Sequence, residues 1–95
     1  MAELNELIHQ SVRLRIMAAL TALPEGTEIE FSALRDLLDL TDGNLGAHLR
    51  KLEDAGYVTV NKTFVGRRPK TFLSASPAGK QAFEAHVAAL KEIIA

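Results

Sequence analysis

Apolar residues recur at intervals of three or four over the first quarter of the chain, which is the spacing of one face of an α-helix. Pro24 and Gly26 follow directly and would end such a helix. We therefore predict a first helix over residues 4–23. Its apolar positions are Leu4, Leu7, Ile8, Val12, Ile16, Leu20 and Leu23.

A second, shorter helix is predicted after residues 27–30, which are too few for more than a brief strand. Ser32 is a suitable N-cap for this helix, because its hydroxyl can accept a hydrogen bond from a free backbone N–H group. The helix should then turn three leucines toward the core: Leu34, Leu37 and Leu38.

A third helix is predicted between Thr41 or Asp42, either of which can cap it, and Gly56, which can adopt the left-handed conformation that ends helices. Gly43 and Gly46 lie within it, and each weakens a helix by about 1 kcal/mol relative to alanine. We expect this pair of glycines to admit the close approach of another backbone. The inward face of the helix should hold Leu45, Leu49 and Leu52.

A hairpin and a final helix complete the chain. Residues 57–65, YVTVNKTFV, have the β-branched and aromatic composition of a strand, and TFLSA at 71–75 should return beside it after a turn shaped by Gly66 and Pro69. Ser76 and Pro77 are favoured at the start of a helix, which should continue to the C-terminus. The order helix, helix, helix, hairpin, helix predicts a mainly α winged helix-turn-helix fold, with residues 1–95 in one domain.

Composition narrows the class of protein. The hydrophobic share of 47% is that of a folded protein, and 95 residues suffice for one domain. The chain has no cysteine, which excludes disulfides and thiolate metal sites. It has no apolar run of the roughly 20 residues that a membrane span needs, and its N-terminus lacks the basic segment of a secretory signal. We expect a cytoplasmic protein that does not enter a membrane.

Charge is divided between two neighbouring segments, although the formal net charge is only −1. Residues 24–42 hold six acidic residues and one basic residue, whereas residues 43–72 hold six basic and two acidic ones. Arg67, Arg68 and Lys70 gather at the predicted turn of the hairpin. Because a local basic patch attracts polyanions even on a mildly acidic protein, the pattern indicates nucleic acid as the partner.

The second and third helices form a helix-turn-helix, which would place the third helix in the major groove of DNA. Asn44 suits bidentate contact with adenine, while His48 and Lys51 can reach phosphates or guanine. The hairpin would lie beside this helix as a wing, and its arginines suit a narrowed minor groove. The predicted DNA contacts are Thr41, Asp42, Gly43, Asn44, Ala47, His48, Lys51, Lys62, Arg67, Arg68 and Lys70.

Four segments resemble winged helix-turn-helix transcriptional regulators of the MarR and ArsR type, in particular their short single-domain members. They are VRLRIMAAL at 12–20, LTDGNLGAHLRKLEDAGYV at 40–58, GRRPKTF at 66–72 and SPAGKQAF at 76–83. The resemblance implies a homodimer that binds an operator in double-stranded DNA and represses or activates transcription. It places DNA contacts on the third helix and the wing, and the dimer interface on the terminal helices.

Dimerisation is also expected from the terminal helices themselves, because a small core cannot cover all of their apolar residues. A two-fold dimer would place two recognition helices about 34 Å apart, which suits a pseudo-palindromic operator. The predicted interface residues are Leu4, Leu7, Ile8, Leu14, Met17, Phe83, His86, Val87, Leu90 and Ile94.

Other functions find less support in the sequence. His9, His48 and His86 lie on different predicted helices without a paired metal-binding spacing, and no serine stands in a nucleophile-elbow context. We therefore expect no enzyme, no catalytic residue and no cofactor or metal, with a His86 site shared across a dimer as the metal alternative. The remaining alternative is a winged-helix protein-interaction module that docks through the acidic segment and does not bind DNA.

Overall fold

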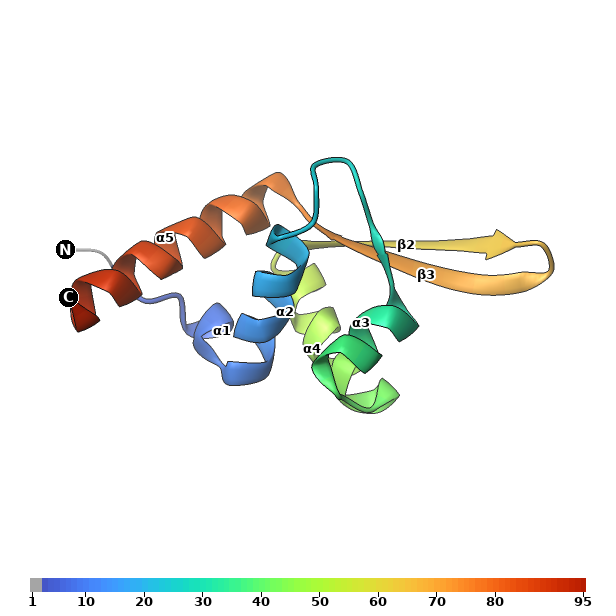
Figure 1. The fold of residues 1–95 in the computed structure, drawn as a ribbon, viewed down its shortest axis with the longest axis horizontal. Coiled ribbons are helices and arrows are strands. Elements are labelled where there is room, and N and C mark those ends of the chain that lie inside the picture. The colour runs from blue at the N-terminus through green and yellow to red at the C-terminus, as the bar shows by residue number, and fades with distance from the viewer. Residues whose placement is uncertain (1–2) are drawn as a thin grey trace.

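The computed structural model describes residues 3–95 and confirms the winged helix-turn-helix arrangement: a helical body from which a long hairpin projects (Figure 1). The elements are α1 (Glu6–His9), α2 (Ser11–Thr21), β1 (Ile29–Glu30), α3 (Phe31–Leu38), α4 (Asp42–Asp54), β2 (Val58–Val65), β3 (Arg68–Ala75) and α5 (Pro77–Ile94).

The first predicted helix is divided in two, so the prediction of one continuous helix is wrong. Gln10 is extended, with φ −60° and ψ 133°, and its side chain accepts a hydrogen bond from the Arg13 N–H at 2.9 Å. Asn5 caps α1 in the same way through the Ile8 N–H. These side-chain caps give the backbone an alternative to continuing the helix.

The sheet is three-stranded and antiparallel, in the order β1-β3-β2. The brief β1 pairs with β3 at Ile29 and Leu73, and β2 pairs with β3 up to Val65 and Arg68. Since β3 begins at Arg68 and not at residue 71 as predicted, the paired ladder extends to the turn at Gly66, whose φ is 65°.

The second predicted helix, α3, differs from the prediction in two ways. It begins two residues earlier, with Glu30 and not Ser32 in the cap position, while the Ser32 hydroxyl donates to the Glu30 carboxylate. Leu34 and Leu38 are buried, but Leu37 is 65% exposed, because the short helix presents only one face to the core. Asp39, with φ 55°, ends the helix, and a tight turn leads to α4.

One core joins the helices to the sheet. Tyr57 lies at its edge: its hydroxyl accepts a hydrogen bond from the Asn5 side chain, and its carbonyl accepts one from the Ser76 N–H. A Cβ at Gly79 would overlap that carbonyl, so glycine is required where α5 crosses it. The buried apolar side chains are Ile8, Ile16, Met17, Leu20, Leu34, Leu38, Leu45, Leu49, Leu52, Val58, Leu73, Ala75 and Ala89.

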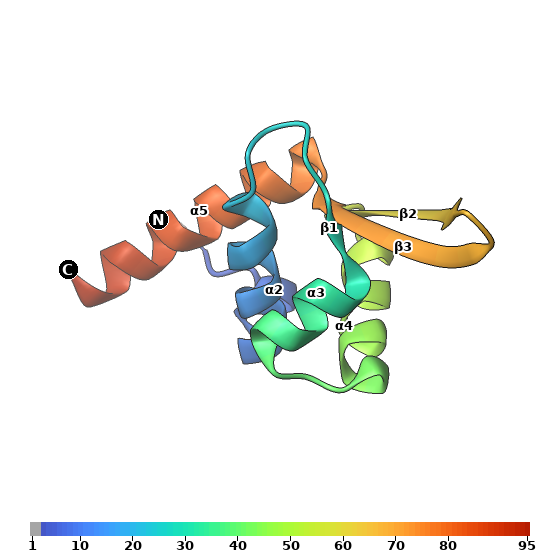
Figure 2. The same cartoon turned by 45° about the vertical axis from the view of Figure 1, so that its right-hand side comes forward.

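The molecule is elongated, with extents of 50 × 26 × 21 Å. The helix α5 runs away from the hairpin, so its C-terminal end and the hairpin tip lie at opposite ends of the molecule (Figures 1 and 2). Among residues 3–95, no helix is long and apolar enough to cross a membrane. The fold thus separates two candidate surfaces, one at the hairpin and α4 and the other on the outer part of α5.

Candidate nucleic-acid interface

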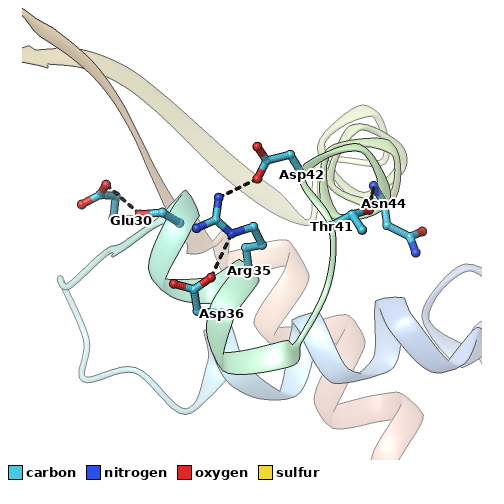
Figure 3. Close-up of polar contacts among 7 residues, drawn as sticks. Glu30, Arg35, Asp36, Thr41, Asp42 and Asn44 are labelled. Carbon is cyan, nitrogen blue, oxygen red and sulfur yellow. Dashed lines mark hydrogen bonds and ion pairs between the residues drawn. The ribbon is translucent and has the colours of Figure 1, made fainter.

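The outward face of α4 is polar, as predicted. Thr41 caps the helix by accepting a hydrogen bond from the Asn44 N–H at 3.1 Å, and the Asn44 side-chain amide extends away from Arg35, Asp36 and Asp42 (Figure 3). Asn44, Ala47 and Lys51 are exposed, while the three leucines at positions 45, 49 and 52 are buried. The helix therefore presents an amide and an ammonium group to solvent along one side.

The glycines of α4 do not meet another part of the protomer. Among residues 3–95, a Cβ added at Gly43 or Gly46 would find no heavy atom within 4 Å outside the adjacent turns of its own helix. The expectation of a nearby backbone is therefore wrong within this chain, and the space beside both residues is open. Any group that comes close to them must come from another molecule.

Arg50 belongs to the same surface and was missed by the sequence prediction. It is exposed, three residues after Ala47, and with Lys62 of β2 it lines a shallow hollow between α4 and the sheet. The i, i+3 spacing from Ala47 was the signal that could have found it, because residues at this interval are neighbours on a helix. Arg50 places a charge between the outward face of α4 and the base of the wing.

His48 is half-buried and bonded, unlike the free outward side chain that the sequence predicts. Its Nδ1 lies 3.1 Å from Nη1 of Arg13, whose Nε donates to the Leu7 carbonyl. A guanidinium group can only donate, so Nδ1 accepts and the ring proton sits on Nε2. Burial, followed by the charges of Arg13 and Lys51, lowers the pKa of His48 below its usual value. At neutral pH the ring can donate through Nε2 but carries no charge.

Two ion-pair groups hold acidic side chains near the site. Arg35 lies between Asp36 and Asp42, at 2.9 and 2.7 Å, and ties α3 to the start of α4 (Figure 3). These two carboxylates raise the pKa of Arg35, with Asp36 contributing most. The charge of Asp42 is thus countered within the protomer.

The wing residue Lys70 is also held in an ion pair. Its ammonium group lies 3.0 Å from the Glu30 carboxylate, and the hydrogen bonds of Lys70 and then Ser32 lower the pKa of Glu30. The sequence predicts that Lys70 contacts DNA, but the structure directs it toward β1. It is the least available of the predicted wing cations.

The remaining cations of α4 and the wing are free. Within residues 3–95, no ion pair engages any of the five, and all five are exposed. Three of them belong to the hairpin, which projects beyond the helical body (Figure 2). They are Arg50, Lys51, Lys62, Arg67 and Arg68.

The predicted dimer surface needs correction at Ile8, Met17 and His86. Ile8 and Met17 are 0% exposed and His86 is 1% exposed, so none of them can meet a partner in this conformation. His86 Nδ1 accepts a hydrogen bond from the Asn5 N–H at 2.9 Å, and its Nε2 lies 3.4 Å from Nδ1 of His9. Both ring nitrogens thus have partners within the protomer, and the metal site shared across a dimer at His86 stays a prediction. Burial, with the nearby His9, lowers the pKa of His86, while Glu6 opposes this effect.

The other predicted dimer residues stay on the surface. On α5, three half-exposed residues and the exposed Ile94 form one stripe, while Leu4, Leu7 and Leu14 are half-buried near the N-terminal helices. In the part of the chain that the structure describes, no three histidine or carboxylate side chains are grouped as metal ligands would be. The half-exposed α5 residues are Phe83, Val87 and Leu90.

Comparisons with known proteins also identify a winged helix fold. A family described as "Winged helix DNA-binding domain" matches residues 12–94. An uncharacterized protein of Methanocaldococcus jannaschii is 37% identical over 82 residues, which is 86% of each chain. The solved structure of a transcriptional regulator homologue from Pyrococcus horikoshii is 32% identical, covers 95% of this chain and 86% of its own, and has a TM-score of 0.84.

A more distant similarity shows the fold alone. Bacillus subtilis PadR, solved in complex with operator DNA, is 18% identical, with a TM-score of 0.66 over 79% of this chain and 46% of the PadR chain. These comparisons do not assign the chain to the MarR or ArsR type, so that narrower assignment stays a prediction.

Proposed function

Since the chain belongs to the winged helix DNA-binding domain family, we propose that it is a transcriptional regulator that binds specific sequences of duplex DNA. In this proposal α4 enters the major groove and the β2–β3 wing lies on the adjacent backbone and minor groove. The observation that carries it is the set of five exposed cations on α4 and the wing, which have no ion pair within residues 3–95. The Pyrococcus relative, described as a transcriptional regulator homologue, supports it, and the fold is shared with PadR, which was solved in complex with operator DNA.

The side chains divide into two roles. Asn44 reads a base, because a side-chain amide can make two hydrogen bonds with adenine in the major groove. Arg67 and Arg68 bind phosphates or the minor groove and set the affinity for any duplex. Gly43 lies beside open space, so its backbone can approach a phosphate without a clash. We propose no enzymatic activity and no cofactor for this site.

The proposal includes a homodimer whose two α4 helices meet successive major grooves of a pseudo-palindromic operator. The stripe on α5 supports a second copy as its occupant, since its last residue, Ile94, is 80% exposed and the adjacent Ile93 is 64% exposed. Both lie at the end of the molecule away from the wing (Figure 1). Leu90→Asp should convert a dimer to a monomer in light scattering. A dimer that persists in this variant would move the interface away from α5.

The DNA proposal is tested by fluorescence anisotropy, with a duplex selected by the protein from a randomised pool and a scrambled duplex. Arg67→Ala/Arg68→Ala should weaken binding to both duplexes. Asn44→Ala should chiefly reduce the preference for the selected sequence, by a factor of about ten for the loss of one good base contact.

The control for the arginine variant is Lys80→Ala/Lys91→Ala, which removes the same charge from α5 and should leave binding unchanged. If the arginine variant binds as tightly as the wild type, the interface is misplaced. If the wild type binds no duplex at low salt, the chain is a winged-helix protein-interaction module instead.

A further inference from the structure

The wing carries an exposed aromatic residue among its cations. Phe64 is 71% and Val65 56% exposed, whereas the other three phenylalanines of the chain are half-buried. Phe64 pairs across the ladder with Pro69, which is also exposed. Phe64 and Pro69 therefore form a small apolar surface on one face of the tip, with Lys62 on the same face and Arg67 in the adjoining turn.

The alternation of side chains along β2 shows which way Phe64 points. Val58 is buried and Val60 half-buried on the face of the sheet that packs against α4. Because successive strand residues alternate between faces, Lys62 and Phe64 continue that same face toward the tip. The hollow that Lys62 lines together with α4 residues is consistent with this orientation. Phe64 thus extends from the side of the hairpin that the proposed DNA would occupy, while Val65 and its cross-strand partner Arg68 lie on the other face.

No part of the described protomer covers this ring, and the proposed α5 dimer surface lies at the other end of the molecule (Figures 1 and 2). The five unpaired cations of α4 and the wing match a polyanion rather than an apolar protein surface. Charge complementarity and continuity with the proposed interface therefore identify duplex DNA as what covers Phe64.

We propose that Phe64 is a minor-groove wedge, which inserts its ring partly between two base pairs while Arg67 and Arg68 hold the flanking phosphates. This inference rests on the proposed function. An apolar wedge unstacks one step and kinks the duplex, and pyrimidine–purine steps such as TA yield most easily. Phe64 would then select sequence through the deformability of the DNA and without any hydrogen bond to a base.

The test uses the full chain and the selected duplex, with 2-aminopurine placed in turn at each position beneath the wing. Wild-type protein should increase the fluorescence at one step and should bind duplexes with TA at that step about tenfold more tightly than those with GC, as expected for one discriminating position. Phe64→Ala should lose both effects, while the salt dependence of its binding should stay unchanged. Val65→Ala, which removes a neighbouring apolar side chain from the opposite face, should behave like the wild type.

The two proposals fail separately. If wild-type protein binds no duplex, the proposed function fails. If it binds but Phe64→Ala keeps the fluorescence increase and the TA preference, only the wedge is wrong. If Phe64→Ala changes the oligomeric state in light scattering, the ring contacts a second protein copy and the wedge is also overturned.

Discussion

Replacing glycine with alanine should change the stability of the protein in opposite directions at two helix positions, Gly46 and Gly79. A Cβ at Gly46 in α4 would meet no atom within 4 Å, whereas a Cβ at Gly79 in α5 would overlap the Tyr57 carbonyl. Gly46→Ala removes the helix-propensity cost of glycine and should raise the free energy of unfolding by about 1 kcal/mol. Gly79→Ala must push α5 away from the carbonyl that Ser76 N–H bonds at 3.0 Å, and should lower that free energy by about 1–3 kcal/mol.

Thermal unfolding followed by circular dichroism measures both effects. For a domain of this size, 1 kcal/mol shifts the midpoint by about 4–8 °C, so the two variants should move it in opposite directions. Ala47→Gly, at the next and exposed position of α4, is the matched control and should lower the midpoint by a similar amount. An unchanged midpoint in Gly79→Ala, or a lowered one in Gly46→Ala, would refute the reasoning.

The Gly46→Ala variant also tests whether Gly46 lies in the DNA interface, because its effect on DNA binding can be measured apart from its effect on stability. Gly46 lies half-exposed on α4, and no described residue fills the space beside it that a Cβ would occupy. If that space receives the DNA backbone, the more stable variant should bind the selected duplex more weakly than the wild type. Equal or tighter binding would show that the glycine has no part in the interface.

Three further predictions concern charge and protonation. If all five free cations of a protomer neutralise phosphates, the logarithm of the DNA association constant should fall with the logarithm of the salt concentration with a slope of about −4.5 per protomer. In anisotropy titrations, Lys62→Ala should make that slope less steep by about 0.9. A DNA affinity that does not change with salt contradicts this prediction. Because the pKa of His86 is lowered below its usual 6.5, the folded state binds fewer protons than the unfolded chain between these two pKa values. The contribution of His86 to the free energy of unfolding is therefore fully present above pH 6.5. It falls as the pH decreases from there toward the folded-state pKa. Urea unfolding should show that decline, by at most about 1.4 kcal/mol per pH unit for one proton, and His86→Gln should flatten it. Arg13→Met removes one of the causes that lower the pKa of His48, so its titration in NMR spectra should move to higher pH; a shift to lower pH would contradict the assignment.

The elements that the sequence predicted well are those with local signals. Thr41 and Ser76 cap α4 and α5 as expected, Pro77 opens α5, and Gly56 has the left-handed φ of 80° that follows α4. The hairpin also follows from residues close in sequence, with Gly66 at its turn. Each of these features depends on the conformational preference of one residue or its neighbour, which the sequence states directly.

The features that the sequence did not predict depend on side-chain partners. The break at Gln10 requires that its side chain accept a hydrogen bond from the backbone, although glutamine is otherwise an ordinary helix residue. His48 was predicted to be free because the helical pattern does not show that Arg13 reaches it across 35 positions. The charge of Lys70 was likewise assigned to the wing surface, whereas β1 brings Glu30 beside it. Such pairings become visible only when the fold places distant residues together.

These pairings explain how a chain of net charge −1 can present a cationic surface. The acidic segment does not cancel the basic one uniformly: Asp36 and Asp42 hold Arg35, and Glu30 holds Lys70, all at the edge of the site. A charge held in a pair at short distance contributes little field beyond it, whereas the unpaired cations of α4 and the wing act at a range of about 10 Å in 0.1 M salt. Residues 43–72 hold six basic residues against Glu53 and Asp54, so we expect a positive field over this surface although the net charge of the chain is −1.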